Sequence, residues 1–306
     1  MKKRLLLLGL AAVMILAAFA VVGCNGDDEV NGGNDVGNDA GNDVGNEIVE
    51  VEKHPVLANT VRGDGVTLTV ATDPTYPPFE SMVGGEKVGF DIDLAKAIAD
   101  YLGAEIEFVA FGWDALLTAL SADSQDFDFA ASAMTIRQDR IDMGILFSNP
   151  YFVSVQAMSV PYDSEINSMD DVGEGFRVAV QNGTTGHIFA QEHLEPLGVV
   201  IRPYEGGVEC YLALASGEVD GVIIDIPVAL NQAEEGDLDL RTIQIPAADA
   251  EYFGLSMGAS RTDMADAINE ALAALIADGT YAEIFARWID ADNPPVLPPA
   301  YWPGAE

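Results

Sequence analysis

The sequence predicts an α/β protein made of two units, each with a mainly parallel sheet flanked by helices. Strand-like and helix-like segments alternate before residue 133 and again after residue 175, with an extended, uncharged segment at 151–160 between the two runs. A strand, a helix and a second strand in succession favour parallel strands, because the helix crosses over the sheet. The chain has 306 residues, of which 49% are hydrophobic, so it can bury a substantial core.

The first run contains five predicted elements. Residues 66–72 (VTLTVAT) alternate between polar and apolar side chains, which is typical of a strand. A helix follows because apolar residues recur on one face, and Gly103 is placed to end it. That face consists of Phe90, Leu94, Ala97, Ile98 and Tyr101. The run is completed by a strand at 105–111, a helix at 113–120 with Leu116, Leu117 and Leu120 turned inward, and a short strand at 127–132.

The second run repeats this alternation. Its predicted strands lie at 176–180, 199–204 and 219–225, with one helix that ends near Leu194 and another at 208–216. Residues 252–260 are extended again, and two amphipathic helices follow at 264–279 and 281–290.

The N-terminus has the pattern of an export signal. Lys2, Lys3 and Arg4 precede an uncharged, apolar run at 5–22. This run is longer than a usual signal core, so an uncleaved membrane anchor competes with a cleaved signal. The sequence VVGC at 21–24 resembles the bacterial lipobox, which favours a signal peptide at 1–23 and a lipid-modified Cys24. Cys210 would then be an unpaired thiol that fills space in a core.

Residues 24–60 are predicted to form a disordered, acidic tether. Gly, Asn, Asp and Val dominate, and a four-residue repeat of the type GNDV runs between 33 and 47, so the segment has little to bury. Calcium binding by the repeated Gly and Asp residues is the alternative, although calcium β-rolls repeat every nine residues. Residues 291–306 are proline-rich and are predicted to be a surface tail.

The charge of the chain argues against one class of partner. Lys and Arg number 14 and Asp and Glu number 50, which gives a formal net charge of -36. Phosphates would be repelled, so we expect no nucleic-acid partner. The sequence contains no catalytic triad, metal-ligand spacing or phosphate-binding loop, so we expect no catalytic residue, no metal and no cofactor.

Candidate site residues gather where predicted strands end. In parallel α/β sheets, ligands bind at the carboxyl ends of the strands. Five groups fall at such ends, namely residues 73–80, Trp113, residues 132–140, residues 182–185 and Asp225. The strand assignment therefore predicts one shared site.

The motifs at these positions resemble those of a known family. They are TDPTYPPFE, VGFDIDLAKAIADYLG, WDALLTAL, SAMTIRQDR, FSNPY, QNGTTG, GEVDGVIIDIPVA and YAEIFARWI, in this order. Together they resemble the family 3 extracellular (periplasmic) solute-binding proteins, which are the receptors of ABC importers for polar amino acids. The resemblance covers about residues 66–290 and implies a type II periplasmic-binding fold of two lobes joined by two hinge strands. It implies lobe 1 at 61–152 and 252–290, lobe 2 at 153–251, and hinge closure of the lobes around an amino acid.

The resemblance assigns Arg140 to the ligand's α-carboxylate. A guanidinium suits this role because its planar fork donates two parallel hydrogen bonds to a carboxylate. The alternative is an ion pair with Asp139 or Asp142. Arg137 stands where the family usually has threonine, and we expect it to point outward.

Four small residues would bring hydroxyl and backbone groups to the same ligand. Ser132, Ala133 and Thr135 precede Arg140, and Ala133 replaces the glycine that is usual in the family. Thr185 would offer its N–H at the start of a helix. A plain helix cap is the alternative for the sequence around Thr185.

Asp225 is similar to the residue that binds the ligand's α-ammonium, with a helix N-cap as the alternative. Tyr76 and Trp113 look like aromatic walls around the ligand side chain, and core packing is their alternative. Asp73 occupies a position where some relatives contact a cationic side chain, which favours arginine, lysine or histidine as ligand. Asp73 also begins a turn, so a purely local role competes. His187 is expected to lie in solvent near the rim.

The resemblance implies a receptor without enzymatic activity. We expect a lipid-anchored, extracytoplasmic monomer that binds a polar amino acid, with a cationic one favoured, and delivers it to the membrane permease of an ABC importer. The alternative is an enzyme that resembles cyclohexadienyl or arogenate dehydratase on the same fold. Glu80 is the only nearby acid that could donate a proton in that reaction. A sensor domain is disfavoured, because no kinase, channel segment or second membrane span follows in the sequence.

Overall fold

The computed structural model describes residues 56, 67–236, 238–245 and 249–289. The predicted signal peptide, the lipidation site Cys24, the acidic tether at 24–60 and the tail at 291–306 therefore lie outside the described residues, apart from Val56. Within the described part of the chain, no helix is long and apolar enough to cross a membrane.

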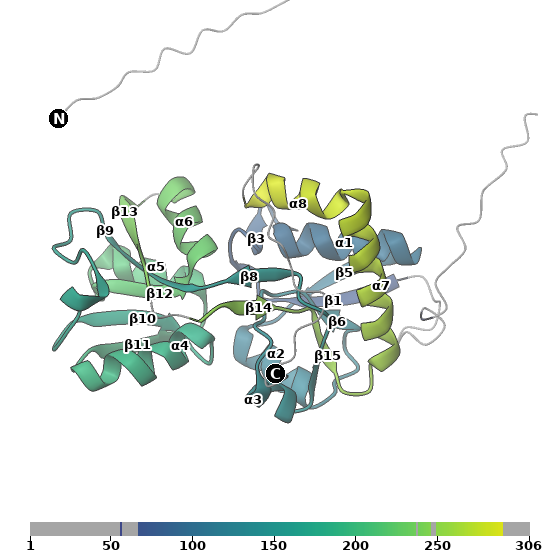
Figure 1. Ribbon diagram of the computed structural model, residues 1–306, viewed down its shortest axis with the longest axis horizontal. Coiled ribbons are helices and arrows are strands. Elements are labelled where there is room, and N and C mark those ends of the chain that lie inside the picture. Colours follow the sequence, from purple (N-terminus) through teal and green to yellow (C-terminus); the bar gives the residue numbers. More distant parts are fainter. Residues whose placement is uncertain (1–55, 57–66, 237, 246–248, 290–306) are drawn as a thin grey trace, which may run out of the picture. The chain divides into compact units, whose positions relative to one another are not determined.

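Lobe 1 is built around a five-stranded sheet with the order β5-β1-β6-β15-β7 (Figure 1). Its strands are β1 (Thr67–Thr72), β5 (Glu105–Ala110), β6 (Phe129–Ala130), β7 (Ile145–Phe147) and β15 (Ser256–Gly258). β5, β1 and β6 are parallel, and β15 is antiparallel to both β6 and β7. The helices of this lobe are α1 (Phe90–Leu102), α2 (Trp113–Ser121), α3 (Gln138–Asp142), α7 (Thr262–Asp278) and α8 (Thr280–Trp288). A small sheet of β2 (Thr75–Tyr76), β3 (Glu80–Val83) and β4 (Glu86–Val88) lies between β1 and α1 in the chain.

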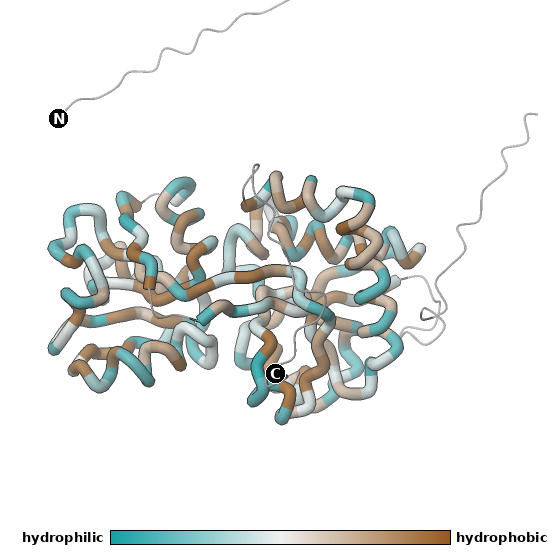
Figure 2. Tube along the Cα trace, in the orientation of Figure 1, coloured by the Kyte–Doolittle hydropathy of each residue, from teal (hydrophilic) through white to brown (hydrophobic). Residues whose placement is uncertain are grey.

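Lobe 2 has a second five-stranded sheet with the order β11-β10-β12-β9-β13. Its strands are β9 (Gln156–Pro161), β10 (Arg177–Gln181), β11 (Val200–Tyr204), β12 (Gly221–Asp225) and β13 (Leu240–Gln244). β11, β10 and β12 are parallel, whereas β9 is antiparallel to β12 and β13. The helical elements are η2 (Met169–Asp171), α4 (Thr185–Phe189), η3 (Ala190–Leu194), η4 (Glu195–Leu197), α5 (Gly207–Ser216) and α6 (Ile226–Glu235). Figure 2 shows hydrophobic residues along β9 and β10, whose residues are mostly buried.

Two short strands connect the lobes. β8 (Phe152–Ser154) and β14 (Glu251–Phe253) pair antiparallel and lie between the two large sheets (Figure 1). Phe152 and Phe253 pack against Phe79 of lobe 1, with ring centroids 4.9 and 5.4 Å from that of Phe79. This aromatic cluster fixes the hinge strands to lobe 1 and so determines where their other side chains lie.

The prediction of a two-lobed α/β fold is confirmed, with differences in detail. Gly103 ends α1 in a left-handed conformation as predicted, but Tyr101 is exposed and donates a hydrogen bond to Glu270 instead of facing the core. Ala97 is only partly buried. The predicted strand at 127–132 is a strand only at Phe129–Ala130, and Ser132 and Ala133, which follow it, line the cavity between the lobes. Several elements were not predicted, namely the small β2-β3-β4 sheet, α3, β7, η2, η4, α6 and β13.

Candidate ligand-binding site

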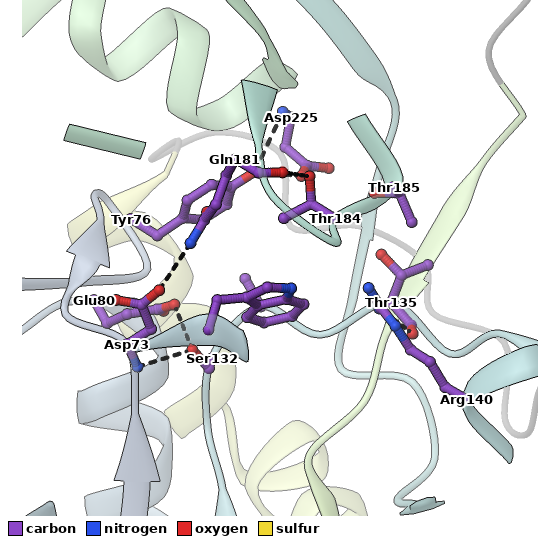
Figure 3. Close-up of a pocket in the computed structure, with 12 residues that line it drawn as sticks. Asp73, Tyr76, Glu80, Ser132, Thr135, Arg140, Gln181, Thr184, Thr185 and Asp225 are labelled. Atoms are coloured by element: carbon purple, nitrogen blue, oxygen red, sulfur yellow. Dashed lines mark hydrogen bonds between the residues drawn. The ribbon is translucent and has the colours of Figure 1, made fainter. Parts of the chain in front are cut away.

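A small cavity lies between the lobes and is lined by all nine residues that the sequence predicted for ligand binding. These are Asp73, Tyr76, Trp113, Ser132, Ala133, Thr135, Arg140, Thr185 and Asp225. Figure 3 shows that the charged groups are separated within the cavity, with Arg140 beside Thr135 and with Asp73 beside Glu80 and Ser132. Glu80, Gln181 and Thr184 complete the lining. The site therefore forms where the strand ends of both lobes meet.

Arg140 is buried and carries the positive charge of the site. One guanidinium nitrogen (Nη1) donates to the Thr135 carbonyl at 2.8 Å, and the guanidinium carbon lies 5.2 Å from the centre of the Trp113 ring. Burial, followed by repulsion from Arg137, lowers the pKa of Arg140 to about 10, so the side chain stays charged at neutral pH. The ion pair with Asp139 belongs to Arg137, whose Nε lies 3.0 Å from a carboxylate oxygen of Asp139. Arg137 is not among the described residues that line the cavity.

Asp225 carries the negative charge on the side of lobe 2. It stands at the N-cap position of α6, but its side chain makes no capping hydrogen bond, so the cap does not account for the carboxylate. Oδ2 accepts the hydroxyl of Tyr76 at 2.6 Å, and Oδ1 is buried without a hydrogen-bond partner among the described residues. Burial, with a further contribution from the charge of Glu251, raises the pKa of Asp225 to about 7. A cation bound beside Oδ1 would favour the ionised carboxylate and so lower the pKa of Asp225 again.

Asp73 lies among groups that donate hydrogen bonds to it. Its two oxygens accept from the Thr75 hydroxyl at 3.0 Å and from the Gln181 amide at 2.8 Å. Burial raises the pKa of Asp73 to about 6, although these two hydrogen bonds oppose the shift. The sequence left open a local turn role for Asp73; the structure shows the turn contact and places the same side chain in the cavity.

Glu80 lies close to Asp73 and is almost fully buried. Its Oε1 accepts from Ser132 at 3.1 Å, and its Oε2 has no hydrogen-bond partner in the described part of the chain. Burial, followed by the charges of Asp91 and Asp73, raises the pKa of Glu80 well above its usual value. Asp91 lies behind the cavity, where it accepts from the Ala133 N–H at 2.8 Å and from Tyr151 at 2.6 Å.

Three contacts join the lobes around the cavity. Tyr76 of lobe 1 binds Asp225, and Gln181 of lobe 2 binds Asp73. Asn182 of lobe 2 also donates to Asp114 of lobe 1 at 2.8 Å. The structure therefore has the lobes in direct contact beside the cavity.

The small residues of the site have backbone conformations that explain their type. Ala133 has a φ of 43°, in the left-handed region that disfavours a Cβ atom, so the glycine usual at this position is physically reasonable. Gly183 has a φ of 69°, and a Cβ there would lie 3.3 Å from Asp114 Oδ1 and 3.6 Å from Trp113 Nε1. Thr184 caps α4, its hydroxyl oxygen accepting from the His187 N–H, so Thr185 is the first helical residue.

Sequence reasoning missed several residues that contact the site. Gln181 is the last residue of β10, one position before the predicted group began, so its place at a strand end was a usable signal. Glu80 was considered only as a proton donor. Gln156 and Glu251, which contact Thr185 and Thr135, come from segments predicted only as extended or not at all. His187 is half-buried outside the cavity and accepts from the Gly183 N–H.

The sequence matches the model of a known protein family. The model of the bacterial extracellular solute-binding proteins, family 3, matches residues 68–291, which is most of the chain. The chain belongs to this family.

The relatives of this solute-binding protein include proteins named for the amino acids that they bind. The histidine-binding periplasmic protein of Escherichia coli K12 is 34% identical over 236 residues, covering 74% of this chain and 88% of the relative. The crystal structure of the arginine-, lysine-, histidine-binding protein ArtJ of Geobacillus stearothermophilus is similar with a TM-score of 0.67 and 32% identity, covering 72% of this chain and 94% of that one. An ancestral amino acid-binding protein, described as a precursor of cyclohexadienyl dehydratase, has a TM-score of 0.67 and 33% identity, covering 73% and 95%.

Family membership settles the general role of the chain. It is a solute-binding protein of a family of extracellular proteins, with the two-lobed fold that the sequence resemblance implied. The relatives named above are binding proteins, one of which is described as the precursor of an enzyme.

Proposed function

We propose that this solute-binding protein holds an amino acid between its lobes and delivers it to an ABC-type importer. The α-carboxylate would bind Arg140, and the α-ammonium would bind Asp225. One observation carries the proposal: a buried guanidinium of lobe 1 and a buried carboxyl group of lobe 2 line the same small cavity without forming an ion pair that the structure records. A zwitterion between them would neutralise both charges, whose burial is otherwise costly.

The remaining lining of the cavity favours a ligand with a cationic side chain. Asp73 and Glu80 lie near each other, and Arg140, the one basic residue of the described cavity lining, lies apart from them (Figure 3). The amide of Gln181 donates to Asp73 at 2.8 Å, as a ligand guanidinium or ammonium could do. The aromatic rings of Tyr76 and Trp113 would pack against the aliphatic part of such a side chain. The names of the relatives, which bind histidine, arginine or lysine, agree with this class.

We further propose that the protein acts as a monomer attached to the outer face of a membrane through lipid on Cys24. The support is the VVGC sequence after an apolar run and the long acidic segment that follows it. Such a tether would let the lobes move to a permease while they stay near the membrane. Mass spectrometry of the N-terminal peptide from the native host tests this, and an unmodified Cys24 or an intact segment at 1–23 would contradict it.

Isothermal titration with each of the twenty amino acids tests the ligand class. We expect L-arginine, L-lysine or L-histidine to bind more tightly than L-glutamine. The matched control is L-glutamate, whose side-chain carboxylate would face Asp73 and Glu80 and should bind weakly or not at all. Binding of L-glutamate in preference to every cationic amino acid would contradict the proposed orientation.

A dehydratase acting on arogenate or prephenate is a second candidate. One observation favours it: Glu80 is a buried carboxyl whose raised pKa keeps its proton available, and one of its oxygens is unpartnered among the described residues of the cavity. Incubation with arogenate or prephenate, followed by detection of phenylalanine or phenylpyruvate, tests this activity. Turnover by the wild type that disappears in Glu80→Gln would establish the dehydratase activity. Absence of product with the wild type would rule out this activity and leave the receptor as the remaining candidate.

A further inference from the structure

Glu251 connects two of the three threonines that line the cavity, although it does not itself line the cavity. It lies on the hinge strand β14, and its Oε2 accepts the Thr135 hydroxyl at 2.8 Å. Its Oε1 accepts from Nε2 of Gln156 at 3.0 Å. The same nitrogen donates to the Thr185 hydroxyl oxygen at 3.2 Å. One hinge carboxylate is therefore linked directly to Thr135 of lobe 1 and, through Gln156, to Thr185 of lobe 2.

The chemistry of these groups fixes the direction of each hydrogen bond. A carboxylate can only accept, so the single hydroxyl proton of Thr135 is directed at Glu251. The oxygen of Thr135 can then only accept a hydrogen bond from a ligand. For the same reason the side of Gln156 that faces Glu251 must be its NH₂ group, which settles the orientation of the amide.

The second amide hydrogen of Gln156 determines the role of Thr185. Because the Thr185 oxygen accepts from Gln156, its own hydroxyl proton is left to donate to a ligand oxygen. Thr135 and Thr185 are chemically identical side chains that line the same cavity. Their connection to Glu251 gives them opposite hydrogen-bonding roles.

We propose that Glu251 is a positioning residue that assigns Thr135 to the ligand's α-ammonium and Thr185 to the ligand's α-carboxylate. The assignment rests on the proposed function, and it gives each threonine the hydrogen-bonding role of one of the two charged residues of the site. Thr135 would supplement Asp225 as an acceptor for the ammonium, and Thr185 would supplement Arg140 as a donor to the carboxylate. Glu251, a hinge residue outside the cavity lining, thus determines which threonine hydroxyl donates a hydrogen bond to the ligand and which one accepts.

Glutamine at position 251 would disturb this assignment without changing the shape of the side chain. An amide offers one acceptor and one donor, so Glu251→Gln cannot accept from both Thr135 and Gln156. In one outcome, the Thr135 hydroxyl accepts from the new amide, and its proton turns toward the ligand ammonium. In the other, the Gln156 carbonyl faces position 251 or Thr185 and accepts the hydroxyl proton that Thr185 would have donated to the ligand. We expect the Kd for L-arginine to rise about tenfold, the loss typical of one hydrogen bond to a charged group.

The experiment combines this variant with removal of the hydroxyls. Isothermal titration with L-arginine is carried out on wild type, Glu251→Gln, the double variant Thr135→Val/Thr185→Val, and the triple variant. We expect Glu251→Gln to change the Kd less than about threefold in the valine background, because no hydroxyl is left to orient. A loss in that background as large as in wild type would mean that Glu251 acts by long-range charge or hinge stability, and would overturn the proposal. Glu283→Gln, an exposed position on α8, controls for the loss of one negative charge.

Two truncated ligands test the roles of the threonines themselves. Agmatine keeps the amine of arginine without the carboxylate, and 5-guanidinopentanoic acid keeps the carboxylate without the amine. Thr135→Val should weaken agmatine more than 5-guanidinopentanoic acid, and Thr185→Val should do the reverse. Equal losses, or the opposite pattern, would refute the assignment while L-arginine binding to wild type would still support the proposed receptor. Failure of wild type to bind any of the twenty amino acids would instead remove the proposed function and this assignment together.

Discussion

At one end of the cavity Arg140 of lobe 1 and Asp225 of lobe 2 offer one charge of each sign, whereas at the other end Asp73 and Glu80 offer only carboxyl groups. The first end is complementary to the α-carboxylate and α-ammonium groups that all amino acids share. The second end lacks a protein cation, and burial raises the pKa of both its acids. Under the proposed function, the first end would provide affinity for any amino acid, and the second end would select the ligand side chain by its charge.

Loss of the cation at the first end should have the largest effect. Arg140→Ala would leave a ligand carboxylate in a dry cavity without its partner, so we expect the Kd for every amino acid to rise by at least about a hundredfold. Isothermal titration measures this effect. Arg137→Ala is the matched control, because Arg137 is paired with Asp139 outside the cavity, and it should retain binding. Unchanged affinity in Arg140→Ala would show that the ligand α-carboxylate does not bind at Arg140.

Loss of charge at the second end should affect ligands unequally. Asp73→Asn keeps the shape of the side chain but removes the partner of a cationic ligand, so we expect the affinity for L-arginine to fall about thirtyfold. The affinity for L-glutamine, which is uncharged at that end, should fall less than about threefold. Competition titration of the two ligands gives the ratio directly. Equal losses would show that the acidic end does not select by charge.

The pH dependence of binding should also distinguish the two ends. The pKa values of Asp73 and Asp225 are about 6 and about 7, both above the usual 3.8. The empty folded protein therefore holds protons that the unfolded chain has released, so these groups make the free energy of unfolding fall as the pH rises from about 4 to about 7. A bound cation favours the ionised carboxylates, so affinity should rise over the same range.

We expect the Kd for L-arginine to fall at least about tenfold between pH 5 and pH 7.5, with a smaller change for L-glutamine. The reason is that L-arginine would engage Asp73 as well as Asp225, whereas L-glutamine would engage Asp225 alone. Titration at the two pH values, with thermal unfolding of the empty protein alongside, measures both trends. Affinity that is constant or decreases with rising pH would show that these carboxyls do not face the ligand cation.

The parts of the site that follow from local pattern were predictable, and those that follow from tertiary contacts were not. Arg140, Asp225 and Trp113 each stand in a motif at a predicted strand end, so their meeting follows from the topology of parallel strands. Tyr101 shows the limit for the fold: its position on α1 fits the apolar face, but its hydroxyl reaches Glu270 and the side chain stays exposed. Helix periodicity alone does not predict this contact.

Glu251 shows the corresponding limit for the site. It is one acidic residue among 50, in a segment that the sequence identifies only by its neighbouring extended pattern. Its importance depends on β14 pairing with β8, which brings it beside Gln156 and Thr135. A hydrogen-bond network whose members are 29 to 116 positions apart in the chain leaves no periodic or compositional signal.

The smallest expected effect concerns the wall between the acidic end and the buried Asp91. Ala133 has a φ of 43°, and an L-residue in the left-handed region costs about 1 kcal/mol or more relative to glycine. Ala133→Gly relieves this cost but adds freedom to the unfolded chain, so we expect a net gain of about 0.5 kcal/mol in the free energy of unfolding. The N–H of residue 133 would still donate to Asp91, so the affinity for L-arginine should change by less than about twofold. Denaturant unfolding and titration of the same variant check both values. A clear loss of stability would show that the alanine methyl makes packing contacts at the cavity wall that outweigh the strain.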